Sequence, residues 1–219
     1  MTHRSIRAVL FDLDGTLADT APDLACALNR LLAERGQAPV PLAQTRPYTS
    51  SGARGLIGAG LGIGPDHPEY EALKMRFLDL YAENILVDTK LFPGMEALLG
   101  ELEKRQLRWG IVTNKAARFT DPLITAMGLA RRSSCTVSGD TTAHIKPHPE
   151  PLLHAARQIG LEPTVCLYVG DDLRDIQAAR AAGMPVLAAA FGYLGDSDPR
   201  DWQADGVINH PSEILNFLA

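Results

Sequence analysis

Short apolar runs that end at turns are spaced along the chain, and they predict buried strands. The clearest run, residues 7–11, leads directly into two acidic residues and a glycine. Uninterrupted apolar runs of this length are typical of strands that are buried on both faces of a parallel sheet. The same pattern predicts strands over residues 107–113, 165–169, 185–190 and, less clearly, 134–138.

Apolar residues at helical spacing fill the intervals between these strands. One helix is predicted over residues 95–102, directly after Pro93 and Gly94, and another runs from Leu173 to a stop near Gly183. Strands that alternate with helices form right-handed βαβ units. The pattern therefore predicts an α/β fold built on a parallel sheet.

The interval between the first and second strands breaks this alternation. It holds far more residues than one crossover needs, and residues 22–84 look entirely helical. The first of two apolar stripes in it consists of Leu24, Leu28, Leu31 and Leu32. We therefore expect a core domain of residues 1–18 and 89–219, with a helical cap of residues 19–88 inserted between its two parts.

A glycine-rich segment lies in the middle of this insertion. Residues 50–64 contain six glycines. This is too many for a rigid helix throughout, because glycine disfavours helical backbone. We expect a loop here, which either closes over a substrate or forms a mobile surface connection.

The composition is that of an ordinary soluble protein with one domain and an insertion. The chain has 219 residues, of which 46% are apolar and 21% charged. Its net charge of −5 argues against binding to nucleic acids or anionic membranes, and no apolar run is long enough to span a bilayer. Three widely spaced cysteines are expected to be reduced, and the N-terminus lacks a secretory pattern. We therefore expect a cytoplasmic protein.

Acidic side chains follow two of the predicted strands. Asp12 and Asp14 come after the first strand, and Asp171, Asp172 and Asp175 come after the fourth. The carboxyl ends of parallel strands meet at one edge of a sheet, so we expect these groups to converge. Two unit charges about 4 Å apart repel by roughly 4 kcal/mol at an effective dielectric near 20, so a cation is expected among them. Oxygen ligands without His or Cys favour Mg²⁺, whose coordination shell a phosphate oxygen can complete.

Phosphoryl transfer at such a site predicts a role for each polar residue. Asp12, at the tip of a rigid strand, is positioned as a nucleophile that attacks phosphorus and forms an aspartyl-phosphate. Asp14 is the expected acid and base, which protonates the departing alkoxide and then deprotonates the hydrolytic water. The Thr113 hydroxyl and the Asn114 amide can hold phosphoryl oxygens, and Lys146 offsets the charge of the nucleophile and the phosphate.

The acidic residues after the fourth strand are the remaining candidates for the metal site. Asp171 is the best further metal ligand. Asp172 and Asp175 either ligate the metal directly, hold metal-bound water or support the ligands from outside. For Asp172, a simple role as an acidic residue at a helix N-terminus is the alternative.

Four motifs, in order, carry a resemblance that covers essentially the full chain. They are DLDGT at residues 12–16, VTN at 112–114, KPHPEP at 146–151 and GDDLRD at 170–175. With them, the chain resembles the haloacid dehalogenase superfamily of phosphohydrolases. The resemblance implies a Rossmann-like sheet with a helical cap after the first strand, Mg²⁺ as cofactor and the aspartyl-phosphate mechanism. It also implies that the backbone carbonyl of Asp14 ligates the metal together with Asp12 and Asp171.

Within this superfamily the chain is similar to the phosphoglycolate phosphatase group, and more narrowly to the phosphatases of N-acetylmuramic acid 6-phosphate. The segments that carry the narrower resemblance are SSGAR, KLFPGM, LRWGIVTNKAARF, VGDDLRDI, FGY and DWQAD. It implies a small phosphorylated metabolite as substrate, with N-acetylmuramic acid 6-phosphate favoured and 2-phosphoglycolate as the alternative. A sugar phosphomutase and a phosphoacceptor signalling domain remain open, because both share acidic residues, Thr and Lys at strand ends. We expect a monomer or a homodimer.

Four cap residues are candidate substrate contacts. Arg46 and Arg54 could meet a carboxylate or a sugar, and Ser51 and Gly52 lie between them in the chain. The alternative for each arginine is a solvated helix face.

Three histidines, His144, His148 and His154, have a spacing that invites comparison with metal sites. No partner cysteine or HExxH pattern accompanies them. We therefore expect solvated positions on a loop or a helix for all three.

Overall fold

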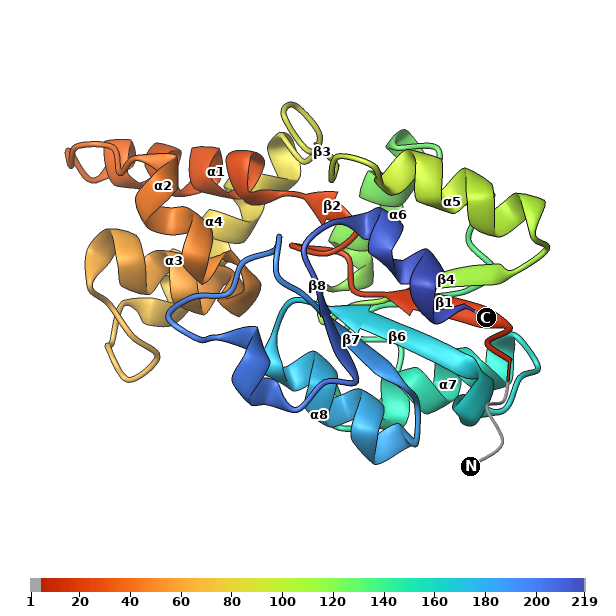
Figure 1. The fold of residues 1–219 in the computed structure, drawn as a ribbon. Coiled ribbons are helices and arrows are strands. Elements are labelled where there is room, and N and C mark those ends of the chain that lie inside the picture. The colour runs from red at the N-terminus through yellow and green to blue at the C-terminus, as the bar shows by residue number, and fades with distance from the viewer. Residues whose placement is uncertain (1–4, 219) are drawn as a thin grey trace.

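The computed structural model describes residues 5–218, which form a six-stranded parallel sheet with helices around it (Figure 1). The strands, in spatial order, are β5 (Thr136–Val137), β4 (Arg108–Val112), β1 (Ala8–Phe11), β6 (Cys166–Gly170), β7 (Val186–Ala189) and β8 (Gly206–Ile208). Neighbouring strands are parallel throughout, which confirms the predicted α/β class. In the register of the sheet, Phe11 of β1 pairs with both Ile111 and Val169, so the three central strands end at one edge.

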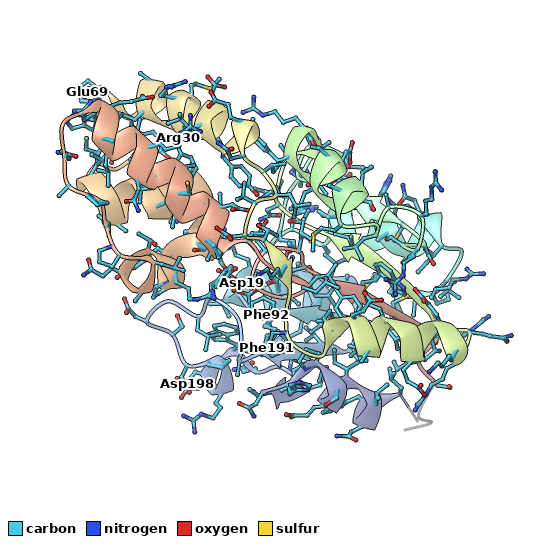
Figure 2. All side chains as sticks on the ribbon, turned by 90° about the horizontal axis from the view of Figure 1, so that it is seen from above. Asp19, Arg30, Glu69, Phe92, Phe191 and Asp198 are labelled. Carbon is cyan, nitrogen blue, oxygen red and sulfur yellow. The ribbon has the colours of Figure 1, made fainter. Side chains whose placement is uncertain are left out.

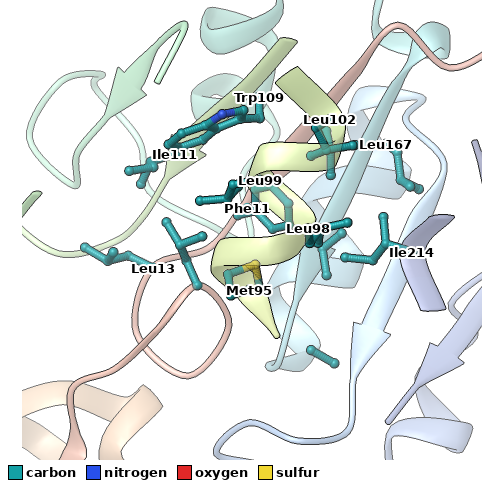
Figure 3. Packing of buried hydrophobic residues seen from close by; sticks show 14 of the residues in the cluster. Phe11, Leu13, Met95, Leu98, Leu99, Leu102, Trp109, Ile111, Leu167 and Ile214 are labelled. Carbon is teal, nitrogen blue, oxygen red and sulfur yellow. The ribbon is translucent and has the colours of Figure 1, made fainter. Parts of the chain in front are cut away.

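Helices cover both faces of the sheet. They are α5 (Met95–Lys104) and α6 (Ala117–Ala126) on one face, and α7 (Glu150–Gln158) and α8 (Leu173–Ala182) on the other. Successive residues of β1 point to opposite faces, so Val9 and Phe11 pack with α5 and α6 while Ala8 and Leu10 pack with α7 and α8. Figure 3 shows Phe11 inside the apolar cluster between the sheet and the face covered by α5 and α6.

Short 3₁₀ segments lie next to strands of the sheet in the chain. They are η2 (Pro163–Val165), η3 (Pro199–Trp202) and η4 (Pro211–Phe217), and the Ile214 side chain of η4 closes the α5 face. Across residues 5–218, every helix is too short or too polar to cross a lipid bilayer.

The inserted helices form an apolar cluster of their own beside the sheet (Figure 1). The elements are α1 (Ala21–Glu34), α2 (Leu42–Thr45), η1 (Arg46–Ser51), α3 (Gly52–Leu61) and α4 (Tyr70–Glu83). The predicted leucine stripe of α1 is buried and packs against Phe77 and Leu80 of α4. Phe119 of α6 also joins this cluster, so the insertion rests on the core through apolar contact.

Two neighbouring chain segments link the insertion to the core. β2 (Ala18–Asp19) and β3 (Lys90–Leu91) pair antiparallel where the chain leaves and re-enters the core. The buried Asp23 carboxylate, in the first turn of α1, accepts hydrogen bonds from the backbone N–H groups of residues 87, 88 and 89 at 2.9–3.0 Å. These bonds fix the start of α1 to the returning chain.

The glycine-rich segment is helical, contrary to the loop expected from the sequence. Residues 52–61 form α3, because Leu56 and Ile57 on one side of it are fully buried in the cluster of the inserted helices. Gly55 faces the backbone carbonyl of Tyr48 so closely that a Cβ would clash with it. Burial of the apolar pair therefore outweighs the low helix propensity of glycine.

Two glycines of α3 provide a matched test of this packing. We expect Gly55→Ala to lower the free energy of unfolding by about 1–3 kcal/mol, because the new Cβ has to displace a backbone carbonyl. A Cβ at Gly58 would enter open space, so Gly58→Ala should raise that free energy by up to about 1 kcal/mol through helix propensity. Urea unfolding of both variants measures the two values. Equal effects would show that α3 does not pack as described.

Candidate active site

The carboxyl ends of β1, β4 and β6 bring predicted acidic residues to one edge of the sheet. β1 continues directly into Asp12, whose backbone N–H donates to the carbonyl of Val169 at 2.9 Å. A turn follows at Gly15, where φ is +88° and any Cβ would clash with the Asp171 carboxylate. Glycine is required here for both reasons, since it alone tolerates this φ without adding a side chain.

Lys146 is the cation at the centre of this edge. Its side chain is 3% exposed, and its Nζ lies 2.9 Å from Asp12 Oδ1 and 2.7 Å from Asp175 Oδ1. The ammonium also donates to the Val112 carbonyl at 3.0 Å and to the Tyr168 hydroxyl at 2.9 Å. Burial by itself would lower the pKa of Lys146, but the two carboxylates outweigh it and raise that pKa. The lysine therefore stays charged although it is buried.

Asp12 is poised between the charged and neutral forms. Burial raises its pKa to about 7, and the charges of Asp175 and Asp14 act in the same direction. Lys146 lowers this pKa but does not fully offset the burial. The ionised form of the Asp12 carboxylate therefore destabilises the fold unless a further positive charge comes close to it.

Asp171 lies close to Asp12 and is fully buried. Its Oδ1 accepts from the Thr16 hydroxyl at 2.8 Å, and its Oδ2 accepts from the Ser50 hydroxyl at 2.9 Å and the Tyr193 backbone N–H at 2.8 Å. Burial, followed by the charges of its acidic neighbours, raises the pKa of Asp171 well above its usual value. The carboxylate is thus held in place by residues from both the core and the inserted helices.

Asp12, Asp171 and Asp175 form a group that could hold a divalent metal. One carboxylate oxygen from each lies within 4.8 Å of the others, and all three residues are buried. When ionised, they carry three negative charges, of which Lys146 offsets one. Two negative charges remain, which is the charge that a divalent cation neutralises. The oxygen-only donor set fits a hard ion.

Asp14 lies outside this group and has its own cation. Its Oδ1 accepts from the Thr20 hydroxyl at 2.6 Å and lies 2.9 Å from Lys115 Nζ. Burial opposes the charge on Lys115, but Asp14 outweighs it and raises the pKa of the lysine. Neither Thr20 nor Lys115 was predicted as a site residue. For Lys115, its position directly after the VTN motif was the available signal.

Thr113 and Asn114 occupy the end of β4, as the sequence indicated. The Asn114 side chain brackets the backbone of Lys146, donating to its carbonyl and accepting from its N–H, both at 2.9 Å. Thr113 is buried, and its hydroxyl oxygen accepts from the backbone N–H of Lys115 at 3.1 Å. Asn114 therefore fixes the lysine loop in addition to any contact with a ligand.

Asp172 and Asp175 have different surroundings. Asp172 is the N-cap of α8 and accepts from the backbone N–H of Arg174 at 2.8 Å, while Asp175 Oδ2 accepts from the Asp172 N–H at 3.1 Å. Burial opposes the charge on Asp172, but hydrogen bonds from Arg174 overcome it and lower its pKa. Asp175 faces Lys146 and the acidic group, whereas Asp172 faces Arg174, whose guanidinium also donates to the Ser50 carbonyl at 2.7 Å.

A cavity of about 340 Å³ opens above the acidic edge, between the core and the inserted helices. Its polar floor includes Asp12, Asp14, Thr113, Lys146 and Asp175. Its apolar wall includes Leu24, Phe77, Leu78, Phe119 and Ile145. Lys74 of α4 and Arg118 of α6 supply positive charge on the lining. A cavity of this size is typical of a small-molecule site.

The candidate cap contacts separate into two groups. Ser51 and Gly52 line the cavity. Arg46 instead forms a two-fold ion pair with Asp19, at 2.7 and 2.5 Å, at the entrance to the insertion (Figure 2 labels Asp19). Arg54 is exposed and, like Arg46, lies outside the set of lining residues. The structure therefore does not bring the two arginines to the cavity.

Tyr81 of α4 lines the cavity and carries a buried polar atom. The residue is 1% exposed, and its hydroxyl has no hydrogen-bond partner among residues 5–218. Lys115 Nζ lies 4.6 Å from the centre of its ring. A buried hydroxyl without a partner is costly in the free protein, which makes it a natural contact for a bound ligand.

Comparison with known proteins identifies the family. Residues 9–189 match the family model described as haloacid dehalogenase-like hydrolase. The chain is 42% identical to an N-acetylmuramic acid 6-phosphate phosphatase of Pseudomonas aeruginosa over 219 residues, which cover 100% of this chain and 97% of that protein. It is 47% identical over 209 residues to a phosphoglycolate phosphatase of Xanthomonas campestris pv. campestris, covering 95% of this chain and 94% of that protein.

Solved structures show the same fold. A crystal structure described as a predicted phosphoglycolate phosphatase from Haemophilus somnus superposes with a TM-score of 0.87 at 27% identity, over 99% of this chain and 100% of that one. The parallel sheet, the acidic edge and these matches agree with the family resemblance read from the four motifs. The chain thus belongs to the haloacid dehalogenase-like hydrolase family and is a phosphatase of that family.

Proposed function

We propose that this phosphatase hydrolyses N-acetylmuramic acid 6-phosphate with Mg²⁺, through an aspartyl-phosphate on Asp12. The observation that carries the proposal is the buried group of Asp12, Asp171 and Asp175. Lys146 forms ion pairs with Asp12 and Asp175, and these three residues line the cavity. It offers a nucleophile, metal ligands and a fixed cation in one place. Relatives named as phosphatases over nearly the full chain support the same chemistry.

The carboxylates of Asp12 and Asp171 and the backbone carbonyl of Asp14 would hold the Mg²⁺. The oxygen-only donors and the two uncompensated negative charges suit this ion. Bound there, the ion would offset the charge of the phosphate and of the nucleophile. Asp175, hydrogen-bonded to Lys146, would support the site from outside the shell of ligands.

In the first chemical step an oxygen of Asp12 attacks phosphorus. An oxygen–phosphorus bond forms to the carboxylate while the ester bond to the substrate breaks, and the departing oxygen takes a proton from Asp14. Thr113 and Asn114 at the end of β4, together with Lys146, hold the phosphoryl oxygens.

In the second step Asp14 removes a proton from a water molecule, and that water attacks phosphorus. The bond between phosphorus and Asp12 breaks, which regenerates the free carboxylate and releases phosphate. Lys115 and Thr20 keep the Asp14 carboxylate oriented in both steps, because they hold its Oδ1 at 2.9 and 2.6 Å.

The lining of the cavity favours a substrate larger than 2-phosphoglycolate. Apolar side chains, the unpartnered Tyr81 hydroxyl and the cations Lys74 and Arg118 surround space beyond the phosphate-binding floor. A sugar that carries an acetamido group and a carboxylate can use all three kinds of contact, whereas 2-phosphoglycolate has only a carboxylate to offer. The named relatives include phosphatases for both substrates, so 2-phosphoglycolate is the second candidate.

In this proposal, residues 19–88 act as a cap over a core of residues 1–18 and 89–219. Ser50 and Ser51 of η1 and Gly52 of α3 then form the edge of the cap that meets the substrate. The proposed substrate is a phosphorylated cell-wall sugar, which would be found in the cytoplasm after its uptake. We therefore expect the enzyme to act in the cytoplasm.

Mg²⁺ binding should strengthen as the pH rises. Burial raises the pKa of Asp12 to about 7, so below that pH a proton competes with the ion for the carboxylate. Because this pKa is raised on folding, protonation stabilises the metal-free fold at low pH, and that contribution is lost as the pH rises from about 4 to about 7. The increase in melting temperature on adding Mg²⁺ should therefore be larger at about pH 8 than at about pH 5.5.

Thermal unfolding with Mg²⁺ and with a chelator, at both pH values, measures this difference. Asp171→Asn should abolish the Mg²⁺ effect, whereas Asp140→Asn, at an exposed position outside the acidic group, should leave it unchanged. A Mg²⁺ effect that is equal at both pH values, or that survives in Asp171→Asn, would contradict the assigned ligands.

Tyr81→Phe tests the assignment of the substrate. Loss of one neutral hydrogen bond of about 0.5–1.5 kcal/mol should lower kcat/KM for N-acetylmuramic acid 6-phosphate by roughly 2- to 10-fold. The free energy of unfolding should be unchanged or higher, because the variant removes a buried hydroxyl that has no partner. Tyr48→Phe, at an exposed tyrosine outside the cavity lining, is the matched control and should change neither value.

The wild-type enzyme should also prefer N-acetylmuramic acid 6-phosphate to 2-phosphoglycolate by at least about tenfold in kcat/KM. Phosphate release from both substrates, and from a panel of sugar phosphates, gives this ratio. A ratio in favour of 2-phosphoglycolate would replace the first candidate substrate with the second.

A further inference from the structure

The loop between β5 and α7, together with the first residue of α7, carries a second group of metal-ligating side chains. His144, His148 and Glu150 have ligand atoms that all lie within 4.8 Å of one another. The two imidazole rings stack with their centroids 4.1 Å apart and 36° between their planes. Both histidines are exposed and Glu150 is partly exposed, so an ion from solvent can reach them. His144 and His148 are thus solvated on a loop, as the sequence predicted, but they lie together, whereas His154 is partly exposed on α7 and lies outside this group.

Hydrogen bonds within the loop keep the three side chains together. Glu150 Oε2 accepts from the His144 backbone N–H, and the Glu150 N–H donates to His148 Nδ1, both at 3.2 Å. The Thr142 hydroxyl donates to the His144 carbonyl at 2.7 Å. A tetrahedral ion with bonds of about 2.0–2.1 Å holds its ligand atoms roughly 3.3 Å apart. Small rotations of exposed side chains are therefore enough to close this group around an ion.

The donor chemistry differs from that of the acidic group. Two imidazoles and one carboxylate are the ligands of a borderline-soft ion such as Zn²⁺, whereas Mg²⁺ prefers oxygen donors alone. We propose that His144, His148 and Glu150 form a second divalent metal site that binds Zn²⁺. Three protein ligands leave the fourth position to water.

This site flanks the lysine of the acidic edge without touching it. His144 and His148 enclose Ile145 and Lys146 in the chain, and Ile145 lines the large cavity. Asn114 already brackets the Lys146 backbone within this loop. An ion held by the two histidines ties the same loop at a second place, so that occupancy stiffens the wall of the cavity that includes Ile145.

Calorimetric titration of the untagged, full-length protein with Zn²⁺, in saturating Mg²⁺, tests the site. The excess of Mg²⁺ keeps the acidic group occupied, so that the measured Zn²⁺ binding comes from the site of the two histidines. We expect one Zn²⁺ per chain and a higher melting temperature in its presence. Absence of stoichiometric Zn²⁺ binding would overturn the proposal.

Substitutions identify the ligands. His144→Gln and His148→Gln should each weaken Zn²⁺ binding tenfold or more and remove the gain in melting temperature, while the unfolding curve without Zn²⁺ stays the same. His67→Gln is the matched control. His67 is exposed, and its Nδ1 accepts from the Glu69 N–H at 3.2 Å, just as the His148 Nδ1 accepts from the Glu150 N–H. Unlike His148, it belongs to no group of metal-ligating side chains in residues 5–218. Binding that is unchanged in the His144→Gln, His148→Gln double variant, or equally weakened in His67→Gln, would overturn the assignment.

Discussion

The buried ion pairs that Lys146 makes with Asp12 and Asp175 are the interaction on which the rest of this structure depends. One ammonium cannot balance the group of three acids that includes Asp171. Burial, together with the charges of the neighbouring acids, raises the pKa of both Asp12 and Asp171. A protein that buries unbalanced carboxylates loses stability, unless protons or a cation compensate. The same imbalance makes the edge of the sheet receptive to a divalent ion and, through it, to a phosphate ester.

The fold places these charges by several independent constraints. Parallel register ends β1, β4 and β6 together, and Gly15 leaves room for Asp171 against the turn after β1. Asn114 fixes the loop of the lysine from the neighbouring strand. The inserted helices also contribute, because the Ser50 hydroxyl and the Arg174 guanidinium join η1 to the acidic edge. The position of the inserted helices is therefore coupled to the geometry of the carboxylates.

Strands and helices with complete apolar patterns were predictable from the sequence, and so was the convergence of acids at the strand ends. β8 was not predicted, because its three residues begin with glycine and carry too short a pattern. The helix α3 was not predicted because the burial that stabilises it comes from other helices. Ser50 and Tyr193 reach Asp171 from distant parts of the chain. The position of Lys115 directly after the VTN motif marks it as a candidate site residue, but it does not indicate that the side chain turns back to Asp14. Such contacts follow from packing, which a single sequence does not display.

The most direct test of the account is to trap the phosphoryl group in Asp14→Asn. With p-nitrophenyl phosphate the leaving group needs no proton, so the first step should proceed, whereas hydrolysis should stall without its base. Mass spectrometry after acid quenching is predicted to find one phosphoryl group on Asp12, with a matching burst of p-nitrophenolate and no adduct in an Asp12→Asn, Asp14→Asn double variant. A phosphoryl group on another residue, or rapid turnover without any adduct, would contradict the central role of Asp12.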